Sequence, residues 1–288
     1  IRLMDYDPVK EPLGRLFNRH KLLRKLFYLL LNILLLRSWH VRKTLRQLAP
    51  QLPSPASILD AGMGFGQYSW WMARRFKGWK ITAADIKSEQ VADCNRFFAA
   101  SGIAERVQAI EADLVTWRSS GSFDLILCVD VMEHIEEDRT VFASFYAMMN
   151  PGGYLVISTP SDRGGSDVHS ADDSSFIGEH VRDGYGREEI TEKLTGAGFD
   201  SVSVAYTYGT PGSIAWRLSM KYPVMMLSAS KLFYILLPFY YLAVMPFVLL
   251  FNTADLCLRH EEGTGSVSYT HLRAHETVLD LVCRLLLE

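Results

Sequence analysis

Cysteine is scarce in this 288-residue chain, and neither sign of charge dominates it. The four cysteines (Cys94, Cys128, Cys257 and Cys283) are widely scattered, and no pair has the spacing of metal ligands or of a redox motif. We therefore expect no metal site and a reducing compartment. The formal net charge of −2 gives no general attraction to nucleic acid, and no basic groove with interleaved aromatic residues is visible. A nucleic-acid partner is therefore not expected.

Short apolar runs alternate with helical stretches from residue 51 onward, without an internal repeat. This alternation indicates an α/β fold that is doubly wound, with a mostly parallel sheet and helices on both faces. The expected strands are residues 57–61, 80–85, 107–112, 123–129, 153–158 and 201–208, and the expected helices are residues 67–76, 89–101, 138–149 and 187–197.

Composition divides the chain into five segments. Residues 1–50 are basic and apolar and predict N-terminal helices, which either cap the core or lie at a membrane interface. Residues 51–210 carry the α/β core, residues 211–260 an apolar helical insert, and residues 261–266 the start of a last strand. The tail, residues 267–288, resembles translated sequencing-adapter read-through, so we expect it to be non-native.

A glycine loop follows the first expected strand. Gly62, Gly64 and Gly66 come directly after Asp60-Ala61 and precede a helix. Glycines permit a tight turn and let backbone N–H groups approach a ligand, and the helix N-terminus adds positive potential. The G-x-G-x-G spacing differs from the G-x-G-x-x-G of dinucleotide enzymes, which cradle a pyrophosphate. S-adenosylmethionine has no phosphate, but its sulfonium and α-amino groups are cationic, and Asp60 suits its amino-acid moiety.

Acidic residues follow the next strands as well. Asp85 ends the second strand, where a carboxylate can accept both ribose hydroxyls of a nucleotide. After the third strand, Asp113 is expected to accept a hydrogen bond from an adenine amino group, and Leu114 to offer its backbone N–H to the ring. Asp130 follows the fourth strand, where substrate and cofactor should meet. Because ligands of open α/β sheets bind at the carboxyl ends of the strands, these residues predict a single site.

An ordered set of motifs resembles those of the class I S-adenosylmethionine-dependent methyltransferases: ILDAGMGFGQYS, ITAADI, EADL, FDLILCVDVMEHI and NPGGYLVIST. The resemblance covers residues 58–159, with a weaker continuation to residue 208. It implies a Rossmann-like, seven-stranded sheet that ends in an antiparallel hairpin of strands six and seven, and S-adenosyl-L-methionine as the cofactor. With Gly66 of the loop included, the expected cofactor-binding residues are Asp60, Gly62, Gly64, Gly66, Asp85, Ile86, Asp113, Leu114 and Asp130.

The candidate catalytic residues lie near the ends of the fourth and fifth strands. Glu133 and His134 resemble the acidic-His element of quinone-pathway O-methyltransferases, and His134 suits a general base, unless both residues only cap the next helix. Residues 160–186 form a long polar insert, which predicts either a lid over the substrate, with His180 and Arg182 reaching inward, or a solvated loop. The expected catalytic set is therefore Glu133, His134 and His180.

The apolar insert contains one long uncharged run. Lys231 is the only charged residue from position 222 to 254, and residues 232–251 are long enough to cross a bilayer. A single crossing would separate strands six and seven, so the insert must return as a helical hairpin broken by Pro238 and Pro246, or fold over the domain. We expect monotopic contact with the cytoplasmic face of a membrane; a hydrophobic cap that forms a substrate tunnel or a dimer contact is the alternative.

These features predict a cytoplasmic S-adenosylmethionine-dependent methyltransferase, peripheral to a membrane, whose substrate is a hydrophobic small molecule or lipid. O-methylation is favoured over C- or N-methylation. One alternative is a NAD-dependent oxidoreductase, which needs a third glycine at G-x-x-G spacing that Phe65-Gly66-Gln67 does not supply. The other is a membrane-associated protein that binds S-adenosylmethionine without turnover.

Overall fold

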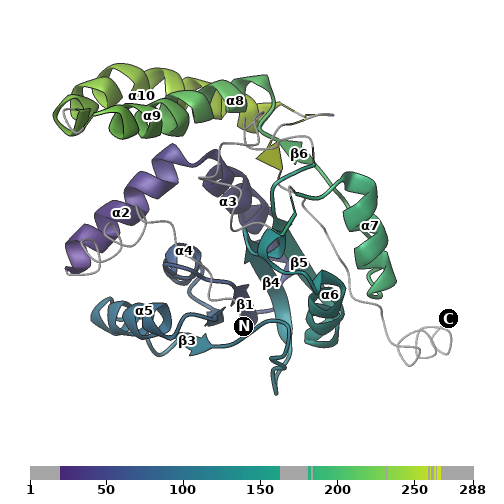
Figure 1. The fold of residues 1–288 in the computed structure, drawn as a ribbon. Helices are drawn as coiled ribbons and strands as arrows, with labels where there is room; N and C mark the ends of the chain where they lie inside the picture. Colours follow the sequence, from purple (N-terminus) through teal and green to yellow (C-terminus); the bar gives the residue numbers. More distant parts are fainter. Residues whose placement is uncertain are drawn as a thin grey trace, which may run out of the picture.

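A computed structural model describes residues 20–162, 181–182, 184–230, 233–258, 260, 263 and 265–266. At its centre is a parallel five-stranded sheet with the strand order β3-β2-β1-β4-β5 (Figure 1). The strands are β1 (Ala56–Ala61), β2 (Trp79–Asp85), β3 (Val107–Glu111), β4 (Phe123–Val129) and β5 (Met149–Ser158). The Rossmann-like fold class is confirmed. His180, most of the polar insert and the tail lie outside the described residues.

Alternate side chains of the strands enter two separate cores. Ile58 and Leu125 belong to the core under α3, α4 and α5, whereas Leu59 and Ile126 belong to the core under α6 and α7. Because successive strand residues point to opposite faces, a sheet covered on both faces needs apolar residues at every position. The covering helices are α3 (Leu36–Leu48), α4 (Gln67–Arg75), α5 (Ser88–Ala100), α6 (Asp138–Ala147) and α7 (Arg187–Gly196).

The expectation of a single seven-stranded sheet is wrong. Strands β6 (Tyr206–Thr207) and β7 (Gly265–Ser266) pair antiparallel in a separate two-stranded sheet. Residues 201–205 show the alternating burial of a strand, and Val202 and Val204 pack against the second core, but they form no ladder. A ladder requires a neighbouring strand, and the described residues of β7 pair with β6 instead of β5.

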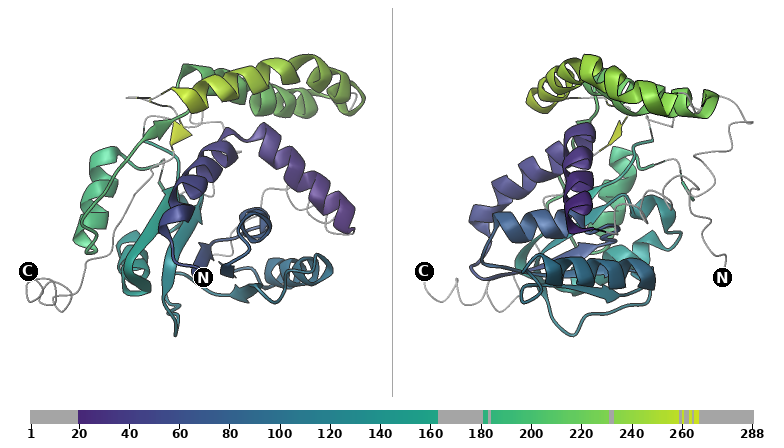
Figure 2. Two further views of the ribbon diagram at one scale, coloured as in Figure 1. Left: turned by 180° about the vertical axis from the view of Figure 1, so that it is seen from behind. Right: turned by 90° about the vertical axis from the view of Figure 1, so that its left-hand side faces the viewer.

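The apolar insert folds as a helical hairpin between β6 and β7. One leg runs through α8 (Thr210–Trp216), the π-helical segment η3 (Arg217–Lys221) and α9 (Tyr222–Ala229), and the other leg is α10 (Phe233–Cys257). The two legs lie side by side at the top of Figure 1 and in both views of Figure 2. The turn lies near Ser230, and α10 continues through Pro238 and Pro246, so the prolines do not break it.

Pro223 explains how the two legs are joined. Proline has no N–H, so the carbonyl of Ser219, four residues earlier, loses its helical donor. The N–H of Tyr222 meanwhile bonds the carbonyl of Arg217, which leaves the carbonyl of Leu218 free as well. The hydroxyls of Tyr240 and Tyr241 in α10 donate to the Leu218 and Ser219 carbonyls at 2.7 and 2.8 Å.

Candidate cofactor and acceptor site

Three glycines shape the loop between β1 and α4. Gly62, Gly64 and Gly66 have φ angles of 75°, 52° and 72°, in the left-handed region that L side chains rarely adopt. The N–H groups of Gly62 and Met63 donate to the carbonyl of Ala84 at 2.8 and 2.9 Å, which fixes the loop to the end of β2. The loop is therefore a rigid turn at the carboxyl edge of the sheet.

The glycines differ in what surrounds them. A Cβ atom at Gly62 would come within 2.2 Å of Cγ2 of Val131, whereas a Cβ atom at Gly64 would meet nothing within 4 Å. Gly62 is therefore needed for packing against the segment after β4. Gly64 faces open space, which leaves its backbone accessible to a ligand.

Asp85 ties the loop to the end of β2. One carboxylate oxygen accepts the N–H of Gly64 at 2.8 Å, and the other accepts the N–H of Lys87 at 3.0 Å. Each oxygen of an ionised carboxylate has two acceptor positions, so both can take a further hydrogen bond. The neighbouring Ile86 side chain is 57% exposed, although it is large and apolar. An acceptor pair beside an exposed apolar side chain suits a ribose and its attached ring.

Asp60 is buried at the end of β1 and accepts a hydrogen bond from the Ser69 hydroxyl. Burial raises the pKa of Asp60 to about 6; the Ser69 hydrogen bond opposes this rise, and the charge of Asp85 adds to it. A ligand cation beside Asp60 would favour its ionised form. The pair of Asp60 and Asp85 therefore fits a cationic nucleoside derivative better than an anionic one.

Asp113 and Leu114 follow β3 at the same edge. Asp113 is exposed, and its carboxylate accepts the N–H of Val115 at 2.9 Å, so it stabilises its own turn. Leu114 is buried. Their expected contacts with an adenine ring stay predictions.

Asp130 and Glu133 lie at the end of β4, next to the glycine loop. Asp130 has a left-handed φ of 50° and forms an ion pair with Arg37. Glu133 is buried and accepts a hydrogen bond from the Thr159 hydroxyl at 3.2 Å. Burial raises the pKa of Glu133, although His134 and Arg37 act against it. His134 is partly buried in the same turn, Met132–His134.

A family profile described as a methyltransferase domain matches residues 36–204. The chain belongs to the class I S-adenosylmethionine-dependent methyltransferases. The cofactor of this family is S-adenosyl-L-methionine, so the family assignment decides against the NAD-dependent alternative. The residues at the sheet edge fit this cofactor, since the loop is open at Gly64 and the carboxylates of Asp60 and Asp85 face the same edge.

Relatives of this methyltransferase match over only part of their length. A ubiquinone biosynthesis O-methyltransferase of Xanthomonas axonopodis pv. citri is 35% identical over 109 residues, which are 37% of this chain and 44% of that protein. Phosphoethanolamine N-methyltransferase 2 of Haemonchus contortus, solved with S-adenosyl-L-methionine, has a TM-score of 0.56 at 17% identity over 80% of this chain and 51% of that one. The cyclase SpnF has a TM-score of 0.54 at 15% identity, covering 80% of each chain. These structural likenesses show the fold alone.

The N-terminal helices of the methyltransferase contact the site; the sequence left a cap over the core as one of two alternatives for these helices, but it indicated none of the contacting residues. In α2 (Lys21–Leu34), the buried Arg24 donates to the Phe65 carbonyl in the glycine loop at 2.9 Å, and the Tyr28 hydroxyl donates to the same carbonyl. Arg37, at the start of α3, reaches Asp130. A buried arginine inside an apolar helix is the one signal that pointed to such a contact, since a charge is rarely buried without partners.

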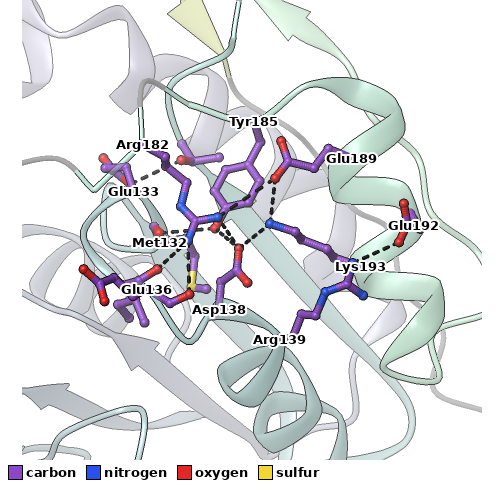
Figure 3. A network of polar contacts seen from close by, with 12 residues as sticks. Met132, Glu133, Glu136, Asp138, Arg139, Arg182, Tyr185, Glu189, Glu192 and Lys193 are labelled. Atoms are coloured by element: carbon purple, nitrogen blue, oxygen red, sulfur yellow. Dashed lines mark hydrogen bonds and ion pairs between the residues drawn. The ribbon is translucent and has the colours of Figure 1, made fainter.

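Arg182 does not reach into the site as expected. Its guanidinium contacts Asp138 and donates to the Ile135 carbonyl at 2.7 Å (Figure 3). Tyr185 and Lys193 also donate to Asp138, at 2.8 and 2.7 Å, and these partners lower the pKa of its carboxyl despite burial. This network anchors the start of α6 to α7. His180, the third expected catalytic residue, lies outside the described residues.

Proposed function

We propose that this chain transfers the methyl group of S-adenosyl-L-methionine to an oxygen atom of a hydrophobic small molecule or lipid. One observation carries the proposal: the acidic glycine-loop site directly adjoins a second polar cluster, Asp130 and Glu133, on a molecule with a large exposed apolar surface. The relatives named ubiquinone biosynthesis O-methyltransferases support O-methylation of a lipophilic acceptor.

The residues at the sheet edge have distinct roles in this proposal. Bound S-adenosyl-L-methionine supplies an electrophilic methyl group on a sulfonium. Asp60 would hold its cationic amino-acid end, Asp85 would hold its ribose, and the loop backbone at Gly64 would contact it. The protein mainly aligns acceptor and methyl group, because the carbon is already activated. In this proposal His134 removes the proton of the acceptor hydroxyl, and Glu133, with its raised pKa, shares that proton.

Calorimetric titration tests the cofactor step. S-adenosyl-L-methionine should bind, and NAD should not. Asp85→Asn should weaken S-adenosyl-L-methionine binding by roughly 10- to 100-fold, because it replaces a charged acceptor. Glu105→Gln, an exposed carboxylate before β3, is the matched control and should bind like the unchanged protein. Absence of S-adenosyl-L-methionine binding would refute the proposal.

A labelled-methyl assay separates turnover from binding alone. Lipid extract supplies the acceptor, and product label is measured for the unchanged protein, for His134→Gln and for the control His20→Gln at the exposed start of α2. His134→Gln should reduce labelling by about 100-fold, the usual contribution of a general base, while S-adenosyl-L-methionine affinity is retained. No labelling by any variant would support the non-catalytic alternative.

The apolar surface supports membrane contact. Helix α10 is long and apolar enough to cross a membrane, yet few of its residues are buried. Both ends of the hairpin adjoin the paired strands β6 and β7, so the chain leaves and returns on one side. The hairpin therefore suits peripheral contact with the cytoplasmic face better than a crossing. Its large exposed apolar residues include Val224, Met225, Ile235, Phe239, Leu242, Phe247 and Leu250.

Vesicle flotation tests this contact. Phe239 and Leu242 are 68% and 78% exposed, so replacing both by Asp should keep the fold and reduce binding to phosphatidylcholine vesicles by at least about tenfold. The matched control places Asp at Gln108 and Thr116, which are exposed on the α/β core. Equal flotation of both double variants, or full solubility of the protein without any vesicle binding, would refute membrane contact.

A further inference from the structure

Arg37 is held firmly at the carboxyl edge of the sheet. A single residue, Leu35, with extended backbone angles of −93° and 104°, separates α2 from α3 and redirects the chain. Arg37 lies in the first turn of α3, and its N–H donates to the hydroxyl of Tyr208 at 3.0 Å. The helix break therefore delivers one cation to the place where β4 ends.

The Arg37 guanidinium contacts the acceptor side of the site. It forms an ion pair with Asp130, and the two side chains remain 27% and 29% exposed, so a ligand can reach both. Its charge also acts on Glu133, whose pKa it lowers against the effect of burial. The Arg37 charge thus acts on both acidic residues that follow β4; His134 acts on Glu133 as well, and Tyr208 is the other titratable neighbour of Arg37.

One N–H donor of the Arg37 guanidinium has no acceptor among the described residues. A guanidinium has five N–H groups, and Nε of Arg37 is buried without a hydrogen-bond partner in the part of the chain that the structure describes. Ser158, whose carbonyl accepts the Asp130 N–H at 2.8 Å, likewise has a buried hydroxyl without a partner there. Buried polar groups are normally hydrogen-bonded, so the unpaired Nε of this partly exposed ion pair marks a place for a ligand.

We propose that Arg37 and Asp130 form an oxyanion subsite that binds the acceptor as the anion of an acidic hydroxyl group, a phenol or an enol. This inference rests on the proposed function and names its acceptor class. Arg37 donates to the ionised oxygen and shares its charge between that oxygen and Asp130. Arginine suits this role because it stays protonated and its planar fork can serve two oxygens at once.

The methyl-transfer step balances with this subsite. The hydroxyl proton passes to His134 or to water, and Arg37 keeps all of its protons. A lone pair of the oxyanion forms the new O–CH₃ bond as the S–CH₃ bond breaks, which leaves a neutral thioether and a neutral ether. The cation at Arg37 favours the ionised acceptor before transfer, so the acidity of the bound hydroxyl is the property to measure.

A chromogenic probe measures that acidity without turnover. A 4-nitrophenol with a hydrocarbon tail is titrated against the full chain saturated with S-adenosylhomocysteine, and phenolate absorbance is followed against pH. The protein should increase the acid dissociation constant of the bound phenol by about tenfold. Arg37→Gln should abolish this increase, and Arg37→Lys should keep part of it. Arg46→Gln, a matched change on the exposed side of α3, should leave it intact.

Asp130→Asn should affect binding of the probe phenolate in the opposite direction to Arg37→Gln. It removes the carboxylate that competes for Arg37, so probe phenolate should bind severalfold more tightly at saturating S-adenosylhomocysteine. Thermal unfolding and S-adenosyl-L-methionine titration confirm that each variant is folded. An unchanged phenol acidity in Arg37→Gln, or no shift with the unchanged protein, would overturn the subsite. Failure of S-adenosyl-L-methionine to bind would instead refute the proposed function.

Discussion

Gly62 and Gly64 belong to the same loop, but a methyl group should have different effects at the two positions. Gly62→Ala combines a left-handed φ of 75° with a Cβ contact of 2.2 Å to Val131, so it should lower the free energy of unfolding by about 2–4 kcal/mol. Gly64→Ala meets no atom within 4 Å and should cost only ~1–2 kcal/mol, yet weaken S-adenosyl-L-methionine binding. Urea unfolding and calorimetry measure the two effects.

Gly102→Ala is the control for backbone strain. Gly102 has a φ of 71°, and a Cβ atom there would also meet nothing within 4 Å, but it lies in the turn after α5. It should cost as much stability as Gly64→Ala and leave cofactor affinity unchanged. If Gly62→Ala and Gly102→Ala lower the free energy of unfolding by the same amount, the Val131 side chain moves aside, and Gly62 is not needed for packing.

Asp60 should make the protein less stable as the pH rises. The ordinary pKa of its carboxyl is 3.8. In the folded protein burial raises this pKa to about 6, because burial disfavours the charged form. The stability that the protonated form contributes is therefore present below pH ~4 and lost as the pH rises through about 6, by roughly 3 kcal/mol. Urea unfolding between about pH 4 and pH 7 measures this loss.

Asp60→Asn cannot ionise and should not show this loss. At neutral pH it should be more stable than the unchanged protein but bind S-adenosyl-L-methionine more weakly, because the cationic amino-acid end loses its counter-charge. Cofactor affinity of the unchanged protein should also fall as the pH drops below about 6. A flat stability profile in the unchanged protein would show that burial does not raise the pKa of Asp60.

Among the elements, α10 depends on one buried carboxylate for its attachment. Oδ1 of Asp255 accepts from His40 of α3 at 3.0 Å, and Oδ2 accepts from the N–H of Gly212 in α8 at 3.1 Å. Nε2 of His260 also lies 3.1 Å from Oδ2. These partners lower the pKa of Asp255 despite burial, so the stability it contributes is present above the ordinary value of 3.8 and lost below it.

Asp255→Ala should loosen the hairpin without unfolding the sheet. Removing one partner of a buried ion pair costs about 3–5 kcal/mol, because the other partners stay buried and unpaired. Hydrogen exchange should accelerate in α8 and α10 and remain slow in β1 and β4. The exposed pair of Arg139 and Glu192 provides the control, since Glu192→Gln should change exchange little. Equal acceleration in β1 would mean that the hairpin and the sheet unfold together.

At the scale of the whole molecule, the sequence predicted the acidic edge of the site, and a cap of N-terminal helices as one of two alternatives, but not the residues that join the two. Asp60, Asp85 and Asp130 each follow an apolar strand, and parallel strands bring their carboxyl ends together, so local patterns suffice. Arg24 and Arg37 act on partners far along the chain, and a single arginine in a helical stretch carries no local sign of its partner. The predicted strand is absent over residues 201–205 for the same reason: a strand ladder depends on a neighbouring strand, which the local sequence pattern does not specify.

The apolar surface extends beyond the hairpin. Its apolar character determines how membrane binding should depend on salt concentration. Leu22, Leu26 and Leu29 of α2 are also exposed, while the whole chain carries a net charge of only −2. Burial of apolar side chains is not screened by ions, unlike attraction between charges. Flotation with phosphatidylcholine vesicles should therefore change less than about twofold between ~0.1 and ~1 M sodium chloride. A steep loss of flotation at high salt would instead assign binding to the basic residues of α2, such as Lys21 and Lys25.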